Sequence, residues 1–208
     1  MDEPNRSFIN SAEPGCHLFL TSPIPPSVNH YLSYRCVVKN GRPMAMSYCT
    51  SEAKKYKNDF AKYVREQVKK QHYILKPNKT QHFYVDSVFY FDRQDKDCNN
   101  YHKCLLDAIT DTHLIWMDDN VVCERVQRIY YDAENPRIEL HIHPVDYIGV
   151  FDNAPQMEEF ISKCVGCTRY SRNCSLLQKA KEGRIQSEIT DGVCKKFKRV
   201  KGEDNYGR

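Results

Sequence analysis

Residues 83–110 read FYVDSVFYFDRQDKDCNNYHKCLLDAIT, and the change of pattern within them decides the fold. Phe83 to Phe91 is rich in aromatic and β-branched side chains, which favour a central strand. From about Asn100 to Thr110 the apolar residues fall at helical spacing instead. The segment therefore predicts a strand, an acidic connection and a helix, whose buried face is formed by Leu105, Leu106 and Ile109.

Further elements are predicted on both sides of this segment. Asn40-Gly41 between two apolar stretches is a strong hairpin signal. An amphipathic pattern that begins at Thr50 or Ser51 predicts a helix of several turns, and Pro25 and Pro26 belong to a rigid loop. These elements indicate an α+β fold. Besides residues 83–91, the predicted strands are residues 17–21, 34–38, 44–48, 121–131 and 137–143.

The composition fits one full domain with a smaller appendage. The chain has 208 residues, of which 40% are hydrophobic, enough for an ordinary globular core. We expect an N-terminal extension over residues 1–16, the main domain over residues 17–147 and a cysteine-rich, basic module over residues 148–208. The apolar runs are too short to cross a membrane and the N-terminus lacks a secretory pattern, so we expect a cytoplasmic protein.

The net charge of +4 makes a polyanion an admissible partner without identifying one. The distribution of basic residues is more informative, because they gather in one stretch from Lys54 to Lys70 and in another from Lys195 to Lys201. Acidic residues gather in the middle of the chain. This uneven distribution favours a polyanionic partner more than the net charge does, although for each lysine alone a solvated helix face is the better explanation.

The acidic centre follows the strand that ends near Phe91. Carboxylate and amide oxygens crowd this connection, Lys103 follows on the helix, and two aspartates come later. Mg²⁺ takes oxygen ligands, and phosphodiester hydrolysis needs a metal that activates water and offsets phosphate charge. A solvated acidic loop that caps a helix is the alternative. The residues concerned are Asp92, Asp95, Asp97, Asn99, Asn100, Asp118 and Asp119.

The order of several short motifs favours the metal site. Residues 97–103 read DCNNYHK, residues 105–109 read LLDAI, residues 116–122 read WMDDNVV, and residues 25–31 read PPSVNHY. Together with Ser51-Glu52-Ala53 and Tyr56, they resemble the RusA-type Holliday junction resolvases from about residue 17 to 143. The resemblance implies a mixed sheet with two main helices, and a homodimer that cuts branched DNA.

The resemblance also assigns the site residues. Asp97 matches the first metal-binding aspartate, Lys103 the catalytic lysine and Asp119 the distal aspartate of a site for Mg²⁺ or Mn²⁺. Asn99 stands where the family has its second aspartate, and a neutral amide binds Mg²⁺ more weakly. Natural divergence, reduced activity and a deliberate substitution each explain Asn99. We favour the third explanation, because the residues around Asn99 are intact.

Further roles are expected for exposed and loop residues. Asn29 and His30 in the proline-rich loop are candidate DNA contacts, although a structural role in the loop is equally compatible with the sequence. Lys54, Lys55 and Arg65 are candidate phosphate contacts, which would give salt-dependent binding. Asp95 is a candidate substitute ligand if a strand continues to Asp97, and Asp107 and Asp118 are candidate supports of the site.

Ten cysteines in a chain with no secretory pattern favour metal ligation or burial over disulfides. Cys164 and Cys167 form a Cys-x-x-Cys pair, and Cys174 and Cys194 complete a set of four. Such a set predicts a tetrahedral zinc site, with an iron–sulfur cluster as the second possibility and reduced, unligated thiols as the third.

Three other functions are compatible with the sequence. The chain could bind branched DNA without cutting it, or cut flaps and branches with no preference for four-way junctions. A regulator that responds to metal or redox state through the cysteine group is the third alternative. Nuclease assays and metal removal separate these functions.

Overall fold

The computed structural model describes residues 15–77 and 81–200. The chain divides into two compact units, residues 1–144 and residues 145–208. Each unit is built around its own cluster of buried apolar residues. Among the described residues, no helix is long and apolar enough to span a membrane.

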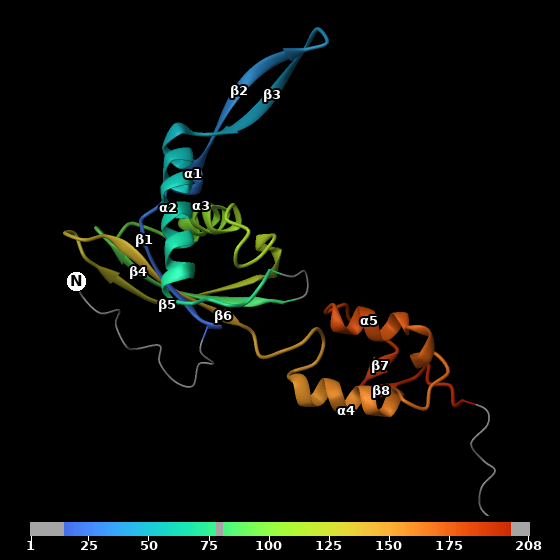
Figure 1. Cartoon of the computed structure of the whole chain (residues 1–208). Coiled ribbons are helices and arrows are strands. Elements are labelled where there is room, and N and C mark those ends of the chain that lie inside the picture. The colour runs from blue at the N-terminus through green and yellow to red at the C-terminus, as the bar shows by residue number, and fades with distance from the viewer. Residues whose placement is uncertain (1–14, 78–80, 201–208) are drawn as a thin grey trace, which may run out of the picture. The chain divides into compact units, whose positions relative to one another are not determined.

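The first unit is built on a four-stranded sheet with the order β1-β6-β4-β5 (Figure 1). The strands are β1 (Leu18–Pro23), β4 (Phe83–Phe91), β5 (Val122–Tyr131) and β6 (Arg137–Pro144). β4 runs parallel to β5, whereas β6 pairs antiparallel with both β1 and β4. The sheet is therefore mixed, as predicted, because the connection through a helix returns the chain to the same direction.

Two helices cover one face of this sheet. They are α2 (Ser51–Lys70) and α3 (Asn99–Thr110), which pack against each other (Figure 1). The side chain of Thr50 caps α2 by accepting the Ala53 N–H, as expected for a helix that begins after Thr50. The predicted helix pair and α+β fold are thus confirmed.

The core lies between these helices and the sheet. Successive side chains of each strand point to opposite faces of the sheet, so one set points to the helices and the other set points away from them. Burying the first set removes apolar surface from water, which is the main force that holds helices on a sheet. The core includes Leu18, Leu20, Phe60, Val64, Phe83, Val85, Phe89, Leu105, Ile109, Ile138, Leu140 and Ile142.

A β-hairpin projects from the helical side of this unit (Figure 1). It pairs β2 (Leu32–Lys39) with β3 (Arg42–Cys49), and its turn residues Asn40 and Gly41 have φ angles of 53° and 73°. Positive φ at both positions is the conformation that an Asn-Gly turn favours, so the hairpin prediction is confirmed. β2 and β3 form a sheet of their own.

The proline-rich segment ends in a short helix, where the sequence predicts a loop. In α1 (Val28–Tyr31), the backbone N–H groups of His30 and Tyr31 both donate to the carbonyl of Ser27. The prolines stop β1, but they do not prevent one helical turn after them. This turn carries Tyr31 into the interior, where it is 8% exposed.

The second unit is small, and helices are the longest elements of its described part. α4 (Ala154–Cys164) begins where Asn153 caps it and Pro155 occupies the first turn. The sequence does not predict α5 (Ser175–Lys181) or the short strands β7 (Ile189–Thr190) and β8 (Val193–Cys194). A 3₁₀ turn, η3, covers Tyr170–Arg172. The buried residues of this unit include Phe151, Phe160, Leu177 and Ala180.

Candidate active site

The connection after β4 forms a turn of its own and does not extend the strand. β4 ends at Phe91, and Asp95 pairs with Arg93 at 2.7 Å, with both side chains exposed. The expectation that Asp95 lies on the same side of a strand as Asp97 is therefore wrong. Local ion pairs close the turn instead, since Asp92 also holds Lys96 at 2.6 Å.

Asp97 stands at the start of α3 and fixes its first residue. One carboxylate oxygen of Asp97, Oδ1, accepts the backbone N–H of Asn99 at 3.0 Å. An acceptor at this place satisfies a backbone donor that has no partner within the helix. Asn99, Lys103 and Asp107 then follow at intervals of four residues, which places them along one side of α3. The helix itself therefore aligns position 99 with the lysine.

Lys103 lies between two carboxylates. Its Nζ donates to Asp107 Oδ1 at 2.9 Å and to Asp119 Oδ2 at 3.1 Å. The hydrogen bond with Asp107, helped by the one with Asp119, raises the pKa of Lys103 above its ordinary value although burial opposes this. The ammonium group consequently stays charged at neutral pH, in a position fixed by two anions.

The chain after α3 is anchored so that Asp119 faces this lysine. Ile115 and Trp116 are fully buried, and Trp116 Nε1 donates to Thr110 Oγ1 at 2.7 Å. Asp118 uses its carboxylate to cap the 3₁₀ turn η2 (Asp119–Val121), where it accepts the Asn120 N–H at 3.0 Å. The two adjacent aspartates thus have different contacts, and Asp119 reaches Lys103.

Tyr31 joins this cluster from the other end of the sequence. Its hydroxyl donates to Oδ2 of Asp107, the oxygen that does not bind Lys103. Burial, followed by the bond to Asp107, raises the pKa of Tyr31, so the phenol keeps its proton. Sequence reasoning assigns no role to Tyr31. Its place at the end of the PPSVNHY segment is the available signal.

The candidate DNA contacts lie on α1 and α2. Asn29 and His30 are exposed on α1, and Thr50 Oγ1 donates to the His30 carbonyl at 2.8 Å, which ties α1 to the start of α2. Lys54, Lys55 and Arg65 are exposed on α2. Lys55 forms a surface pair with Asp59 at 3.6 Å, a contact that contributes little to stability.

The four grouped cysteines are neighbours in the second unit. Cys164 ends α4, Cys174 precedes α5 and Cys194 ends β8. Burial, and then the charges of Cys194, Cys167 and Cys174, raise the pKa of Cys164. Among the described residues, these sulfurs do not form a group arranged to hold a metal ion.

Cys167 has the surroundings of a thiolate. Burial alone would raise the pKa of Cys167, but backbone N–H groups of Lys198, Arg169 and Tyr170 hold it below the ordinary value. The bond from Lys198 N to Sγ measures 3.5 Å. Backbone donors that point at a sulfur stabilise its anionic form, which is the form that binds metals.

A charged lysine held by carboxylates, beside an oxygen-rich loop on a mixed α+β sheet, is the type of site found in enzymes that act on phosphodiesters. The family model of the endodeoxyribonuclease RusA matches residues 23–143, which is more than half of the chain. The chain belongs to the RusA family of endodeoxyribonucleases. This membership implies a nuclease that acts on branched DNA, the Holliday junction. No match was found among the curated proteins.

Proposed function

We propose that this chain is a divalent-metal-dependent endonuclease that resolves four-way DNA junctions. Asp97, Asn99 and Asp119 hold Mg²⁺ or Mn²⁺, and Lys103 contacts the scissile phosphate. The observation that carries this proposal is the position of Lys103, whose charged Nζ lies within 3.1 Å of both Asp107 and Asp119. Asn99 and Lys103 share one side of α3, Asp97 precedes this helix, and Asp119 contacts Lys103 from the turn η2, which supports the proposal.

The donor set fits a hard cation, because it consists of oxygen atoms only. Asp97 uses Oδ1 for the Asn99 N–H, and a carboxylate has a second oxygen that can bind a cation. Asn99 offers a neutral carbonyl oxygen in place of a carboxylate. When bound, the metal ion supplies an activated water and offsets charge on the phosphate.

The residues of the chain supply position and charge. An ammonium group has three donors, and Asp107 and Asp119 accept two of them, so the third can point to a phosphate oxygen. Developing negative charge on that oxygen is stabilised by a cation that is already in place. Asp107 acts through Lys103 and is a positioning residue, and Tyr31 in turn positions Asp107.

Under this proposal, we expect Asn99 to weaken the activity of the chain. Replacing a carboxylate by an amide removes one negative charge from the metal site without changing the shape of the side chain. A deliberate Asp-to-Asn change remains our preferred explanation, with natural divergence and reduced activity as the others. The intact contacts of Lys103 and Asp119 support this preference.

Exposed basic residues on α2 would bind the DNA backbone, and two copies of the chain would place two active sites on a junction of near two-fold symmetry. Lys54, Lys55 and Arg65 are exposed, as binding to phosphates requires. Asn29 and His30 are proposed as further DNA contacts on α1. Replacing the three basic residues by alanine should make junction affinity less dependent on salt, with the slope reduced by about one for each side chain that binds a phosphate.

The test compares the chain with its Asn99→Asp variant on a labelled four-way junction and on a matched linear duplex. Each reaction contains either Mg²⁺ or EDTA. We expect paired cuts near the crossover that need Mg²⁺, at a rate about a hundredfold higher in the variant. An Asp95→Asn variant is the matched control, since Asp95 is exposed and pairs with Arg93 outside the site.

The other outcomes separate the alternative functions. Junction binding without cutting by both proteins would overturn the enzyme assignment and favour a non-catalytic branched-DNA-binding protein. Equal cutting of flaps and four-way junctions would remove the specificity and leave a general branch nuclease. Cutting that persists in EDTA would exclude the metal site.

For the second unit, we propose that Cys164, Cys167, Cys174 and Cys194 bind Zn²⁺, with an iron–sulfur cluster as the second possibility. The backbone donors around Cys167 support a thiolate ligand. Binding would draw the four sulfurs closer than they now lie. Metal analysis and X-ray absorption of the purified chain test this assignment. Loss of the sulfur shell in a Cys174→Ser variant is expected, whereas retention of the full metal content would overturn the proposal.

A further inference from the structure

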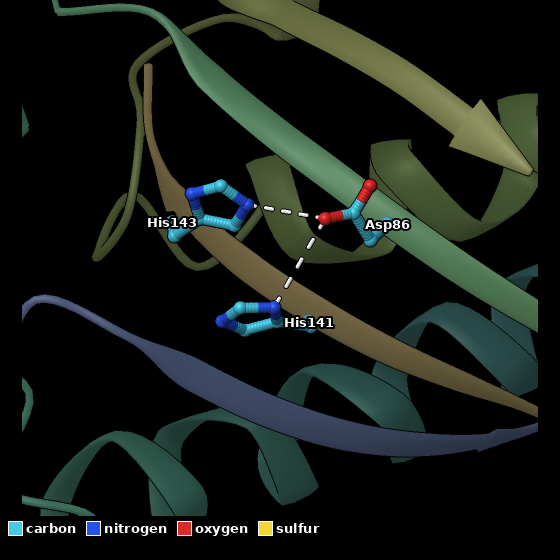
Figure 2. A group of neighbouring side chains, drawn as sticks. All are labelled: Asp86, His141 and His143. Carbon is cyan, nitrogen blue, oxygen red and sulfur yellow. Dashed lines mark hydrogen bonds and ion pairs between the residues drawn. The ribbon is translucent and has the colours of Figure 1, made fainter. Parts of the chain in front are cut away.

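A second polar cluster lies on the sheet face opposite the helices. Figure 2 shows Asp86 of β4 facing two histidines of β6, His141 and His143. Oδ2 of Asp86 lies 3.1 Å from His143 Nε2 and 4.0 Å from His141 Nδ1. One ligand atom from each residue lies within 4.8 Å of the other two. Among the described residues, this is the group of His, Cys, Asp or Glu side chains arranged to hold a metal ion.

The register of the sheet assembles this cluster. β6 pairs antiparallel with β4 so that Asp86 lies opposite His141, and His143 lies opposite Tyr84. Residues two apart in a strand share a face, which places both imidazoles on the side away from the helices. A shift of the pairing by one residue would send them into the core. The cluster is therefore a property of the folded sheet and has no local motif.

Asp86 is buried, ionised and fixed in orientation. It is 4% exposed. Its Oδ1 accepts Arg125 Nε and Gln127 Nε2, each at 2.6 Å, and its Oδ2 accepts Arg125 Nη2 at 2.7 Å. Burial alone would raise the pKa of Asp86, but the bonds from Arg125, Gln127 and His143 hold it below the ordinary value. Outer hydrogen bonds of this kind orient the carboxylate ligands of metal ions.

His17 lies next to the histidine pair of β6. It precedes β1, and its Nδ1 lies 2.7 Å from His141 Nε2. Either ring can be the donor in this bond, so His17 holds the His141 ring in place by a hydrogen bond through Nε2, and Nδ1 of His141 lies 4.0 Å from Oδ2 of Asp86.

We propose that Asp86, His141 and His143 form a transition-metal site. Two imidazole nitrogens and one carboxylate oxygen suit Zn²⁺, Ni²⁺ or Co²⁺ and disfavour Mg²⁺, which takes oxygen ligands. The metal ion joins β4 to β6 on the face away from Lys103, so this site is separate from the proposed nuclease site. His17, Arg125 and Gln127 form its outer layer.

The cation of Arg125 limits the affinity of the site. Its guanidinium lies over the ring of Tyr84 at 3.6 Å, and its Nη2 lies 2.7 Å from Asp86 Oδ2 and 3.2 Å from His143 Nε2, so a bound metal ion has to displace Nη2 from both ligand atoms. The positive charge of Arg125 already balances the negative charge of Asp86. A bound divalent metal ion would therefore leave the site with a net positive charge, which an added anion or hydroxide can offset. This feature explains how a buried carboxylate remains stable before metal binds.

Burial also acts on one of the proposed ligands, His141, which needs its neutral form to bind a metal ion. Burial, and then the charges of His143 and His17, lower the pKa of His141 to about 4. The ring is therefore neutral at pH 7, and neutral imidazole is the ligand form. His141 is 5% exposed, so water competes weakly for its nitrogen atoms.

The first experiment follows ring nitrogens in the full chain. In the ¹⁵N-labelled chain, after chelation, the cysteine group is first saturated with Zn²⁺. Ni²⁺ or further Zn²⁺ is then titrated while the imidazole nitrogen signals are recorded by NMR. We expect the signals of His141 and His143 to shift or broaden first among the eight histidines of the chain. Unmoved signals for these two rings would overturn the proposal, and this test needs no variant.

The second experiment counts metal ions in variants. A His143→Phe variant and a His113→Asn control are compared by equilibrium dialysis and metal analysis, since His113 is exposed and asparagine tolerates its positive φ of 50°. We expect His143→Phe to bind about one metal ion fewer per chain and the control to match the parent. Equal binding by both would contradict the site. Circular dichroism in EDTA confirms that each variant is folded.

Discussion

The two faces of the main sheet each present a charged cluster, and the clusters are assembled in different ways. On the helical side, Lys103, Asp107 and Asp119 belong to one helix and the turn that follows it. On the other side, Asp86 and His141 lie far apart in the sequence and meet only through strand pairing. A local cluster depends on helix geometry, whereas a distant one depends on the register of the whole sheet.

The difference extends to the protonation states. The helical cluster is half-exposed and places Lys103 between two carboxylates, which raises the pKa of the lysine and keeps it charged. The sheet cluster is largely buried and surrounds Asp86 with Arg125 and with His141, whose pKa is lowered by burial. The first arrangement suits a substrate phosphate, and the second suits a metal ion that prefers nitrogen ligands.

The largest effect is expected from the centre of the helical cluster. A Lys103→Met change in the Asn99→Asp background removes the cation that faces the phosphate, and cleavage of a four-way junction should fall by about 10²- to 10³-fold. Single-turnover cleavage measures this change. A Lys54→Met variant is the comparison for loss of DNA binding, because Lys54 is exposed on α2 and is a proposed phosphate contact away from Lys103. A loss of the same size in both variants would point to DNA binding instead of catalysis.

A smaller loss of cleavage is expected when Lys103 is kept but its hydrogen bond to Asp107 is weakened. Asp107→Asn weakens the hydrogen bond to Nζ and leaves the phosphate-facing cation in place. Cleavage should fall by about tenfold, with a lower pKa for Lys103 in the pH profile, because Asp107 is the main cause of its raised value. A loss as large as that of Lys103→Met, with no change in the pH profile, would assign Asp107 a direct role in catalysis.

On the opposite face of the sheet, a change at Gln127, which orients Asp86, should affect metal binding and leave cleavage unchanged. Gln127→Met removes one bond to Oδ1 while leaving the three proposed ligands intact. Ni²⁺ affinity should fall by about tenfold and junction cleavage should not change. A Gln94→Met variant, at an exposed position of the connection after β4, is the control. An unchanged Ni²⁺ affinity would remove Gln127 from the site.

The smallest effect on cleavage is expected from Tyr31, which contacts Asp107 from a distant part of the sequence. Tyr31→Phe deletes the hydroxyl that binds Asp107 Oδ2 and retains the buried ring. The hydrogen bond is worth about 1 kcal/mol, so cleavage in the Asn99→Asp background should fall by about fivefold. Tyr34→Phe, on the exposed hairpin, serves as its control. Equal rates for both would show that the helix alone positions Lys103.

Much of the fold was predictable because its signals are local. The aromatic strand over residues 83–91, the Asn-Gly hairpin and the helix after Thr50 each follow from neighbours in sequence. The same holds for the spacing of Asn99, Lys103 and Asp107 along α3. Where the local signal was ambiguous the prediction failed, as with Asp95 in a turn and with the short helix α1.

The sequence by itself determined the α+β class and the group of four cysteines, since motifs and periodicity record contacts between nearby residues, and its resemblance to the RusA family assigned the candidate catalytic residues. Tertiary structure alone decided that Tyr31 reaches Asp107 and that Asp118 caps a turn while Asp119 faces Lys103. It also decided that Asp86 meets two histidines. The register of β4 and β6 and the packing of α1 on α3 set these contacts, and neither leaves a pattern in one segment.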